Sequence, residues 1–246
     1  MEEDKKTYQL NTKQRHLLIL LYKFRFATVT QLTDYLDLKA NSTLNRNLKL
    51  LVDKKLVGRY YKESFRIDRK HAVYYLAKEG IRTLREDERL DMAVLNSYYK
   101  NRQVSEPFMR HHVDALAVYN ALRTSYGDTY DIFTKQELSG FEETPDTPPD
   151  LYMRGEKEAF IVLAHDVQPF IYRKWLAEYI EHSEEEGWPS GKYPALLFVL
   201  ADATQERRFL EFAAKSLESA GIPDEELKIS ACTITALLRK PYQPVL

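Results

Sequence analysis

The side chains best suited to chemistry lie in one stretch, residues 147–166, which reads TPPDLYMRGEKEAFIVLAHD. Asp150 follows two prolines, and His165 and Asp166 stand at the end of the apolar run that comes next. Two carboxylates on neighbouring strands can bind Mg²⁺, and a nearby lysine can position or deprotonate an attacking water. Asp150 and Asp166 are therefore candidate metal ligands for phosphodiester hydrolysis.

The other groups that such a site needs are missing from the sequence. The second strand should carry an acid and a lysine two residues apart, because side chains at this spacing share a face. Aliphatic residues fill this strand up to Ala164, and no lysine stands two positions after Asp166. His165 would face away from Asp166 if both lay on the strand. We therefore expect Asp150 to begin a turn and expect no catalytic residue and no metal. A nuclease using Asp150, Asp166 and Lys174 of the next helix is the alternative.

Composition indicates an ordinary globular chain. Of its 246 residues, 44% are hydrophobic and 30% are charged. No apolar run approaches the ~20 residues that span a bilayer, and the first residues lack a signal peptide's apolar core. The single cysteine, Cys232, lies in an apolar run and has no partner for an internal disulfide. We expect a cytoplasmic protein that contacts no membrane. No cofactor is expected, because glycine loops for phosphate, CxxC and GxSxG are all absent.

Charge divides the chain into two unlike parts. Residues 1–90 hold 20 Lys and Arg against 12 Asp and Glu, whereas residues 91–246 hold 16 against 25. The first part is therefore strongly basic and the second strongly acidic. This asymmetry indicates that only the first part meets a polyanion, which charge alone leaves open between nucleic acid and an anionic membrane.

The basic part is expected to contain three helices followed by a hairpin and a fourth helix. The first helix covers residues 12–22 with Asn11 or Thr12 as its cap, and the second is short and capped by Thr30. The third begins near Asn41 or Ser42, and its Leu44, Leu48 and Leu51 form one apolar stripe. Two strands, VGRYYKES and a segment beginning HAVYYL, flank the basic turn FRIDRK at residues 65–70. A helix over 78–86 follows.

With LLVDKKLVGRYYKES and HAVYYLAKEG around this turn, residues 10–85 resemble a winged helix-turn-helix domain. The resemblance implies that the third helix enters the major groove of duplex DNA, where an α-helix fits and reaches base edges. It also implies that residues 65–70 form the wing, whose cations lie against phosphates or in the minor groove. The alternative is a solvated helix face and a charged turn, or a domain that binds protein. The candidate DNA-binding residues are Asn41, Ser42, Thr43, Asn45, Arg46 and Lys49 of the helix, and Arg66, Arg69 and Lys70 of the wing.

The acidic part predicts one mixed sheet with helices on its faces. Its expected elements are a helix (108–127), a strand (131–138), a hairpin around Gly155 (149–155 and 158–166), a helix (169–186), a strand (193–202), a helix (204–221) and a strand (228–235). This α-β-β-β-α-β-α-β order resembles the core of restriction-endonuclease-like nucleases of the PD-(D/E)xK type. The predicted fold class is therefore α+β: a winged helix domain over 1–88, a connector over 89–106, and a nuclease-like α/β domain without activity over 107–246.

RHHVDALAVYNAL, PPDLYM and RKWLAEY in this part, together with the winged region, give the chain a resemblance to the replication-relaxation family of plasmids and integrative elements. The resemblance implies sequence-specific binding of double-stranded DNA in replication, transfer or transcriptional control of a mobile element. A homodimer is expected because winged domains commonly bind paired half-sites. The acidic domain would serve dimerisation or recruit a replication or transfer protein. The alternatives are the metal-dependent nuclease and a scaffold that binds protein through both domains.

Overall fold

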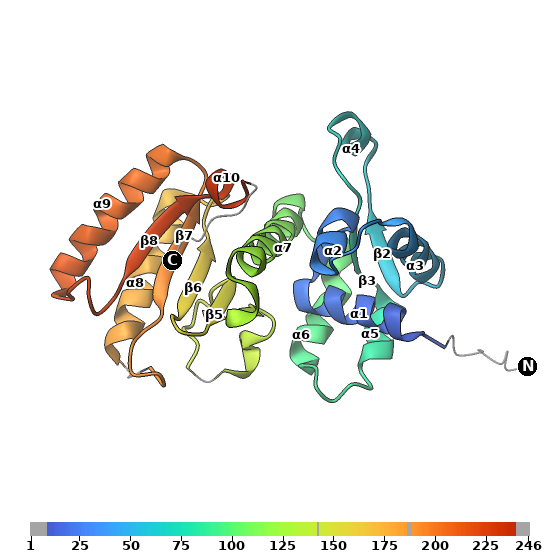
Figure 1. The fold of residues 1–246 in the computed structure, drawn as a ribbon, viewed down its shortest axis with the longest axis horizontal. Coiled ribbons are helices and arrows are strands. Elements are labelled where there is room, and N and C mark those ends of the chain that lie inside the picture. The colour runs from blue at the N-terminus through green and yellow to red at the C-terminus, as the bar shows by residue number, and fades with distance from the viewer. Residues whose placement is uncertain (1–8, 142, 186–187, 240–246) are drawn as a thin grey trace, which may run out of the picture. The chain divides into compact units, whose positions relative to one another are not determined.

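The computed structural model describes residues 9–141, 143–185 and 188–239, and Figure 1 shows it as a ribbon. The chain divides after Val104 into two compact units. Within the described ranges, no helix is both long and apolar enough to cross a membrane.

The first unit contains the three expected helices. They are α1 (Thr12–Phe24), α2 (Val29–Tyr35) and α3 (Ser42–Asp53). Asn11 caps α1 in a reciprocal capping box with Gln14. Thr28 caps α2 through a second capping box, so the prediction of Thr30 as the cap was wrong by two residues. The strand β1 (Phe26–Thr28) comes directly before α2. The backbone is therefore extended up to Thr28, and the helix begins at Val29.

A three-stranded antiparallel sheet completes the helix-turn-helix core. Its order is β1 (Phe26–Thr28), β3 (Val73–Leu76) and β2 (Val57–Tyr60), and α5 (Lys78–Leu84) follows β3. The strand β1 was not predicted. The order of helices and strands, with β2 and β3 joined by a projecting segment, is that of a winged helix domain, as expected from the sequence.

The segment between β2 and β3 contains a short helix, α4 (Glu63–Ile67), where a loop was predicted. Figure 1 shows this helix at the tip of the two arms of the wing. Phe65 is only 5% exposed and meets the rings of Tyr60 and Tyr61 edge-on. This aromatic cluster explains the helix, since burying Phe65 at the tip requires the chain to turn back on itself.

Residues expected to connect the two domains instead pack on the first unit. They form α6 (Met92–Ser97) and a 3-10 helix, η1 (Tyr98–Gln103). Tyr98 is buried and donates its hydroxyl hydrogen to the carbonyl of Tyr22 at 2.7 Å. Arg25 donates from Nε to Asn101 at 2.9 Å. The segment is therefore part of the winged unit, which ends near residue 104.

The second unit follows the predicted order of helices and strands, with the short helices η2, η3 and α10 in addition. Its elements are α7 (Glu106–Tyr126), η2 (Gly127–Thr129), β4 (Asp131–Thr134), η3 (Leu138–Gly140), β5 (Leu151–Arg154), β6 (Ala159–Leu163), α8 (Pro169–Glu185), β7 (Ala195–Leu200), α9 (Ala203–Ala220), β8 (Ile229–Thr233) and α10 (Ile234–Leu237). The α+β fold class with a mixed-sheet second domain is confirmed.

The strands of this unit form one sheet in the order β4-β5-β6-β7-β8. The first three strands pair antiparallel, and β6, β7 and β8 pair parallel. Helices α8 and α9 connect the parallel strands and cover one face, where Phe160, Phe198 and Phe209 are at most 1% exposed. Helix α7 lies on the other side of the sheet (Figure 1). The turn that follows β6 reaches α7 through His165 and Asp166, and the candidate site residues of this unit lie there.

Candidate functional site

The recognition-helix candidates are the N-cap residue and the exposed edge of α3. Leu44, Leu48 and Leu51 are 3%, 0% and 0% exposed, so the predicted burial of this stripe is confirmed. Positions of a helix that lie outside such a buried stripe face away from the core. The side chains that do so here are all exposed: Asn41, Ser42, Thr43, Asn45, Arg46 and Lys49.

The start of α3 is held by a side chain that was not singled out. Asn47 accepts a hydrogen bond from Gln14 of α1 at 3.3 Å and donates to the carbonyl of Thr43 at 3.1 Å. Asn41 occupies the N-cap position, but its side chain makes no capping hydrogen bond. The first turn of α3 is thus fixed to α1 through Asn47, while Asn41 is left to project outward.

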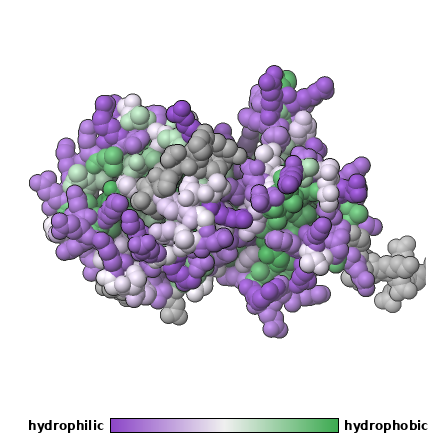
Figure 2. Space-filling view, viewed as in Figure 1, coloured by the Kyte–Doolittle hydropathy of each residue, from purple (hydrophilic) through white to green (hydrophobic). Residues whose placement is uncertain are grey.

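The wing brings together the predicted cations. Arg66, Arg69 and Lys70 are exposed on α4 and in the residues after it. Lys70 Nζ lies 3.3 Å from Asp68 and 5.9 Å from the centre of the Phe65 ring. In Figure 2 the surface of this projecting segment is largely hydrophilic.

Two further cations of the wing were missed. The guanidinium of Arg59 lies 4.7 Å from the Tyr61 ring, and Lys62 Nζ lies 5.4 Å from the Tyr60 ring. Each aromatic ring supports a cation at an exposed site, which restricts the side chain without removing its charge. The interleaved basic and aromatic residues of GRYYK were the signal that could have found them.

In the second unit, Asp150 is fully engaged by protein groups. Its Oδ1 lies 2.6 Å from His111 Nε2, and its Oδ2 accepts the Leu163 N–H at 2.7 Å. Burial opposes charge on both partners, but the hydrogen bond and the charge of His111 outweigh it and lower the pKa of Asp150. In the same way, burial is outweighed by Asp150, and the pKa of His111 is raised. The two residues therefore form an ion pair between α7 and the start of β5.

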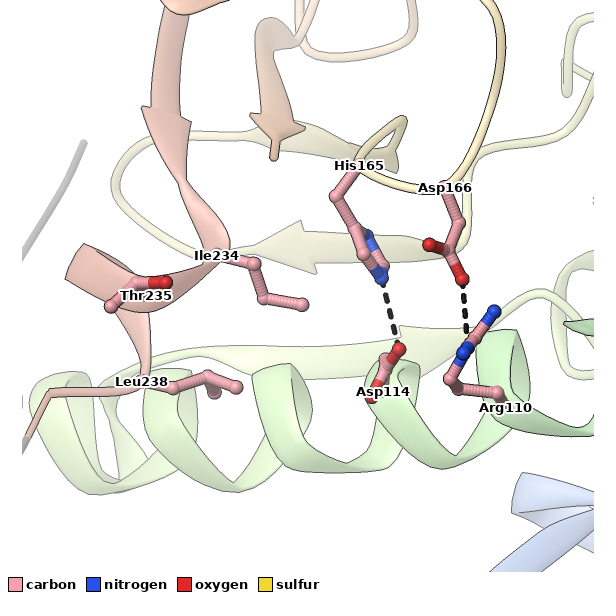
Figure 3. Close-up of a pocket in the computed structure, with 7 residues that line it drawn as sticks. All are labelled: Arg110, Asp114, His165, Asp166, Ile234, Thr235 and Leu238. Carbon is pink, nitrogen blue, oxygen red and sulfur yellow. Dashed lines mark hydrogen bonds and ion pairs between the residues drawn. The ribbon is translucent and has the colours of Figure 1, made fainter. Parts of the chain in front are cut away.

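His165 and Asp166 lie beyond the end of β6, in the turn after Leu163. The prediction that they face opposite ways was wrong, because strand alternation stops where the strand ends. His165 Nε2 lies 2.9 Å from an oxygen of Asp114, and Asp166 accepts from Arg110 Nε at 2.9 Å. Figure 3 shows both side chains pointing from this turn to α7.

These four residues line a pocket together with Ile234, Thr235 and Leu238 from α10 and the residue after it. Asp114, His165 and Asp166 each place one possible ligand atom within 4.8 Å of the others. Asp150 is not a member of this group. Asp114 was not predicted, because only the packing of α7 beside the end of β6 brings it close to His165.

The three residues of the alternative nuclease each have a different partner. Asp150 pairs with His111, Asp166 pairs with Arg110, and Lys174 Nζ lies 3.4 Å from Glu178 one turn along α8. Cys232 is partly buried, and burial raises its pKa to about 12. Its thiol therefore stays protonated near neutral pH and is a poor nucleophile.

Comparison with known proteins relates this arrangement to one family. The sequence model described as replication-relaxation matches residues 18–166, which is more than half of the chain. The chain belongs to the replication-relaxation family. The part matched to this family runs from α1 through the wing and α7 to Asp166 in the pocket.

Two solved structures are similar to this family member, and both are single-residue mutants of Lactococcus lactis ZitR. Each shares 15% sequence identity with it, with a TM-score of 0.29, over 45% of this chain and 73% of the other. The winged helix assignment therefore rests on the strand order and helices of the first unit itself. Among curated proteins, none matches the chain significantly.

Proposed function

We propose that this member of the replication-relaxation family binds duplex DNA in a sequence-specific manner through α3 and the wing. The observation that carries this proposal is the surface of the first unit. A buried leucine stripe leaves the polar edge of α3 exposed, and a second, cationic element projects from the same unit. One element would read bases, while the other would hold the phosphate backbone.

The side chains of α3 suit base recognition. Arginine can donate two hydrogen bonds to guanine, and asparagine can pair with adenine in the same bidentate way. Arg46 and Asn45 lie on the exposed edge of α3 near its start, where recognition helices contact base edges. Cations of the wing add affinity that is independent of sequence.

The process served would be replication, transfer or transcriptional control of a mobile element. The family match supports the replication part of this statement. Two copies binding paired half-sites would account for specificity in a long genome, so we propose a homodimer on DNA. The second unit would provide the contact between copies or recruit a replication or transfer protein, and we propose that it does not cut DNA.

Selection from a random pool of duplex DNA tests the proposal. The full chain should enrich one motif, with two half-sites about 10 base pairs apart, or a multiple of that spacing, if it binds as a dimer. Fluorescence anisotropy should then show tighter binding to the enriched site than to scrambled DNA of equal length. Enrichment of no motif, with equal weak binding to all sequences, would favour the scaffold that binds protein.

A further inference from the structure

Asp114, His165 and Asp166 converge on one pocket of the second unit from two rigid elements. Asp114 lies near the middle of the 21-residue helix α7. His165 and Asp166 lie in the turn after β6, and the backbone just before this turn is fixed by the Ala164 N–H, which donates to the Val199 carbonyl at 2.8 Å. Sites on helices and strand ends are held more firmly than sites on free loops.

The donor atoms form a compact mixed set. They are two carboxylates and one imidazole, with one possible ligand atom from each residue within 4.8 Å of the others. Imidazole suits zinc, copper, iron and nickel, whereas magnesium and calcium prefer oxygen alone. Three protein ligands with further positions left for water are typical of accessible zinc sites.

His165 supplies a second, independent sign of a ligand. Its side chain is only 8% exposed, yet Nδ1 has no hydrogen-bond partner within the part of the chain that the structure describes. The other nitrogen faces Asp114. Buried polar atoms are nearly always hydrogen-bonded, so this nitrogen calls for a partner that the protein does not supply, such as a water or an ion.

The pocket is open enough for an ion to enter it from solvent. The side chains of Asp114 and Asp166 are 24% and 34% exposed, so the carboxylates are open to the outside while the imidazole is covered. Arg110 donates to Asp166 and is itself 53% exposed. It lies one helical turn before Asp114, on the same face of α7.

We propose that Asp114, His165 and Asp166 bind one divalent transition-metal ion, with Zn²⁺ favoured over Mg²⁺. The ion would join α7 to the end of β6 beside α10, independently of DNA binding by the first unit. Arg110 would compete with it, because the guanidinium and the metal both require the carboxylate of Asp166. This site is distinct from Asp150, both of whose oxygens are occupied by His111 and the Leu163 N–H.

Isothermal titration calorimetry with Zn²⁺ and with Mg²⁺ as probes tests this site. The protein is the tag-free full chain, from which a chelator has first removed any bound metal. We expect one Zn²⁺ per chain and much weaker binding of Mg²⁺. Asp166→Asn, at a partly exposed position, should weaken Zn²⁺ binding by about 10-fold or more, as should Asp114→Asn. Circular dichroism checks that both variants fold.

Two further variants separate a metal site from a set of ordinary hydrogen-bonded pairs. Arg110→Ala removes the competing cation and should strengthen Zn²⁺ binding, opposite in sign to the aspartate variants. His182→Gln removes a histidine that pairs with Tyr193 elsewhere in the unit and should leave binding unchanged. Absence of Zn²⁺ binding, or binding that is equal in wild type, Asp114→Asn and Asp166→Asn, would overturn the proposal and leave the pairs as simple links between α7 and the sheet.

Discussion

Asp150 and His111 form an ion pair, with 2.6 Å between Oδ1 and Nε2, that ties the start of β5 to helix α7. The second carboxylate oxygen of Asp150 accepts the N–H of Leu163 at the end of β6. One carboxylate therefore links a helix to two strands. This structural role explains an aspartate that resembles a metal ligand in the sequence.

The pair predicts that Asp150→Asn destabilises the second unit in a pH-dependent way. Because the pKa of His111 is raised, its contribution is complete below the ordinary histidine pKa of about 6.5 and is lost as the pH rises through the raised value. Because the pKa of Asp150 is lowered, its contribution is present above the ordinary value of about 3.9 and is lost as the pH falls through the lowered value. The loss in unfolding free energy should therefore be greatest between about pH 4 and 6.5, at about 3 kcal/mol.

Urea unfolding followed by tryptophan fluorescence measures this effect, since both tryptophans, Trp175 and Trp188, belong to the second unit. Asp131→Asn is a matched control, because Asp131 is an exposed aspartate that pairs with Arg154 at 3.5 Å. It should change stability by no more than about 0.5 kcal/mol. A loss in Asp150→Asn that is the same at every pH would contradict the ion pair.

The leucine stripe of α3 predicts a loss of stability confined to the first unit. Leu48 is 0% exposed, so Leu48→Ala should leave a cavity and lower the unfolding free energy by about 2–5 kcal/mol. Leu50→Ala, two residues away and only half-buried, should cost less. Thermal melting by circular dichroism measures the change, while the tryptophan signal of the second unit should stay as in wild type. Equal effects of the two variants would mean that the stripe does not pack against the helix-turn-helix core.

Most of the fold could be predicted because periodicity is a local property. The leucines of α3 repeat at helical spacing, and the apolar runs of β6 and β7 are bounded by turn residues. The strand β1 was missed because its three residues carry no repeat, and its partner β3 lies far along the chain. The helix α4 was missed because five residues give no period, and its cause is the burial of Phe65.

The site in the second unit was harder to predict than the fold. Asp114 and His165 are 51 positions apart in the sequence, and only the packing of α7 beside the end of β6 brings them together. The predicted strand also ran too far along the chain. Ending it at Leu163 places His165 and Asp166 in a turn, where both can reach α7. Local patterns therefore singled out Asp150 and Asp166 together, whereas the structure places Asp166 near Asp114 and His165.

Arg46 on the exposed edge of α3 predicts a loss of specific DNA binding. Arg46→Ala should weaken binding to the selected site by about 1–3 kcal/mol, because the paired hydrogen bonds to one base are removed. Folding should be unchanged, since an exposed arginine contributes little packing. Arg82→Ala on α5 removes an exposed arginine outside α3 and the wing and serves as the control. The role of α3 in recognition is refuted if both variants bind the selected site as wild type does.

The cations of the wing predict a loss of DNA affinity that does not depend on sequence, unlike the loss expected for Arg46→Ala. Replacing Arg66, Arg69 and Lys70 with alanine should weaken selected and scrambled DNA alike, because interactions with phosphates carry little sequence information. The slope of log affinity against log salt should decrease by up to about 0.9 for each phosphate that the wing no longer neutralises.

A charge-matched control for the wing lies in the second unit. Arg207, Arg208 and Lys215 are exposed on α9, and replacing all three with alanine removes the same charge from the chain. This control should leave the salt slope almost unchanged. If the two triple variants lower affinity and slope equally, the wing contributes only to net charge and does not touch the DNA backbone.

The last prediction concerns cleavage. Phosphodiester hydrolysis needs a metal held by suitably placed acids and a group that positions the attacking water. In this chain both oxygens of Asp150 are occupied, Lys174 pairs with Glu178 on its own helix, and Asp166 faces Arg110. An ion at Asp114, His165 and Asp166 would therefore lack both the lysine and Asp150.

We accordingly expect no nicking of supercoiled plasmid over a range of Mg²⁺ and Mn²⁺ concentrations. Asp150→Ala and Asp166→Ala are the controls, because a nuclease built on these two acids would lose its activity in both. Metal-dependent nicking that disappears in both variants would make the protein an enzyme of that kind. Nicking that survives Asp150→Ala but is abolished in Asp166→Ala and Asp114→Ala would instead locate the activity at the pocket beside α7. Either result would overturn the expectation, and the variant pattern would identify which carboxylates hold the metal.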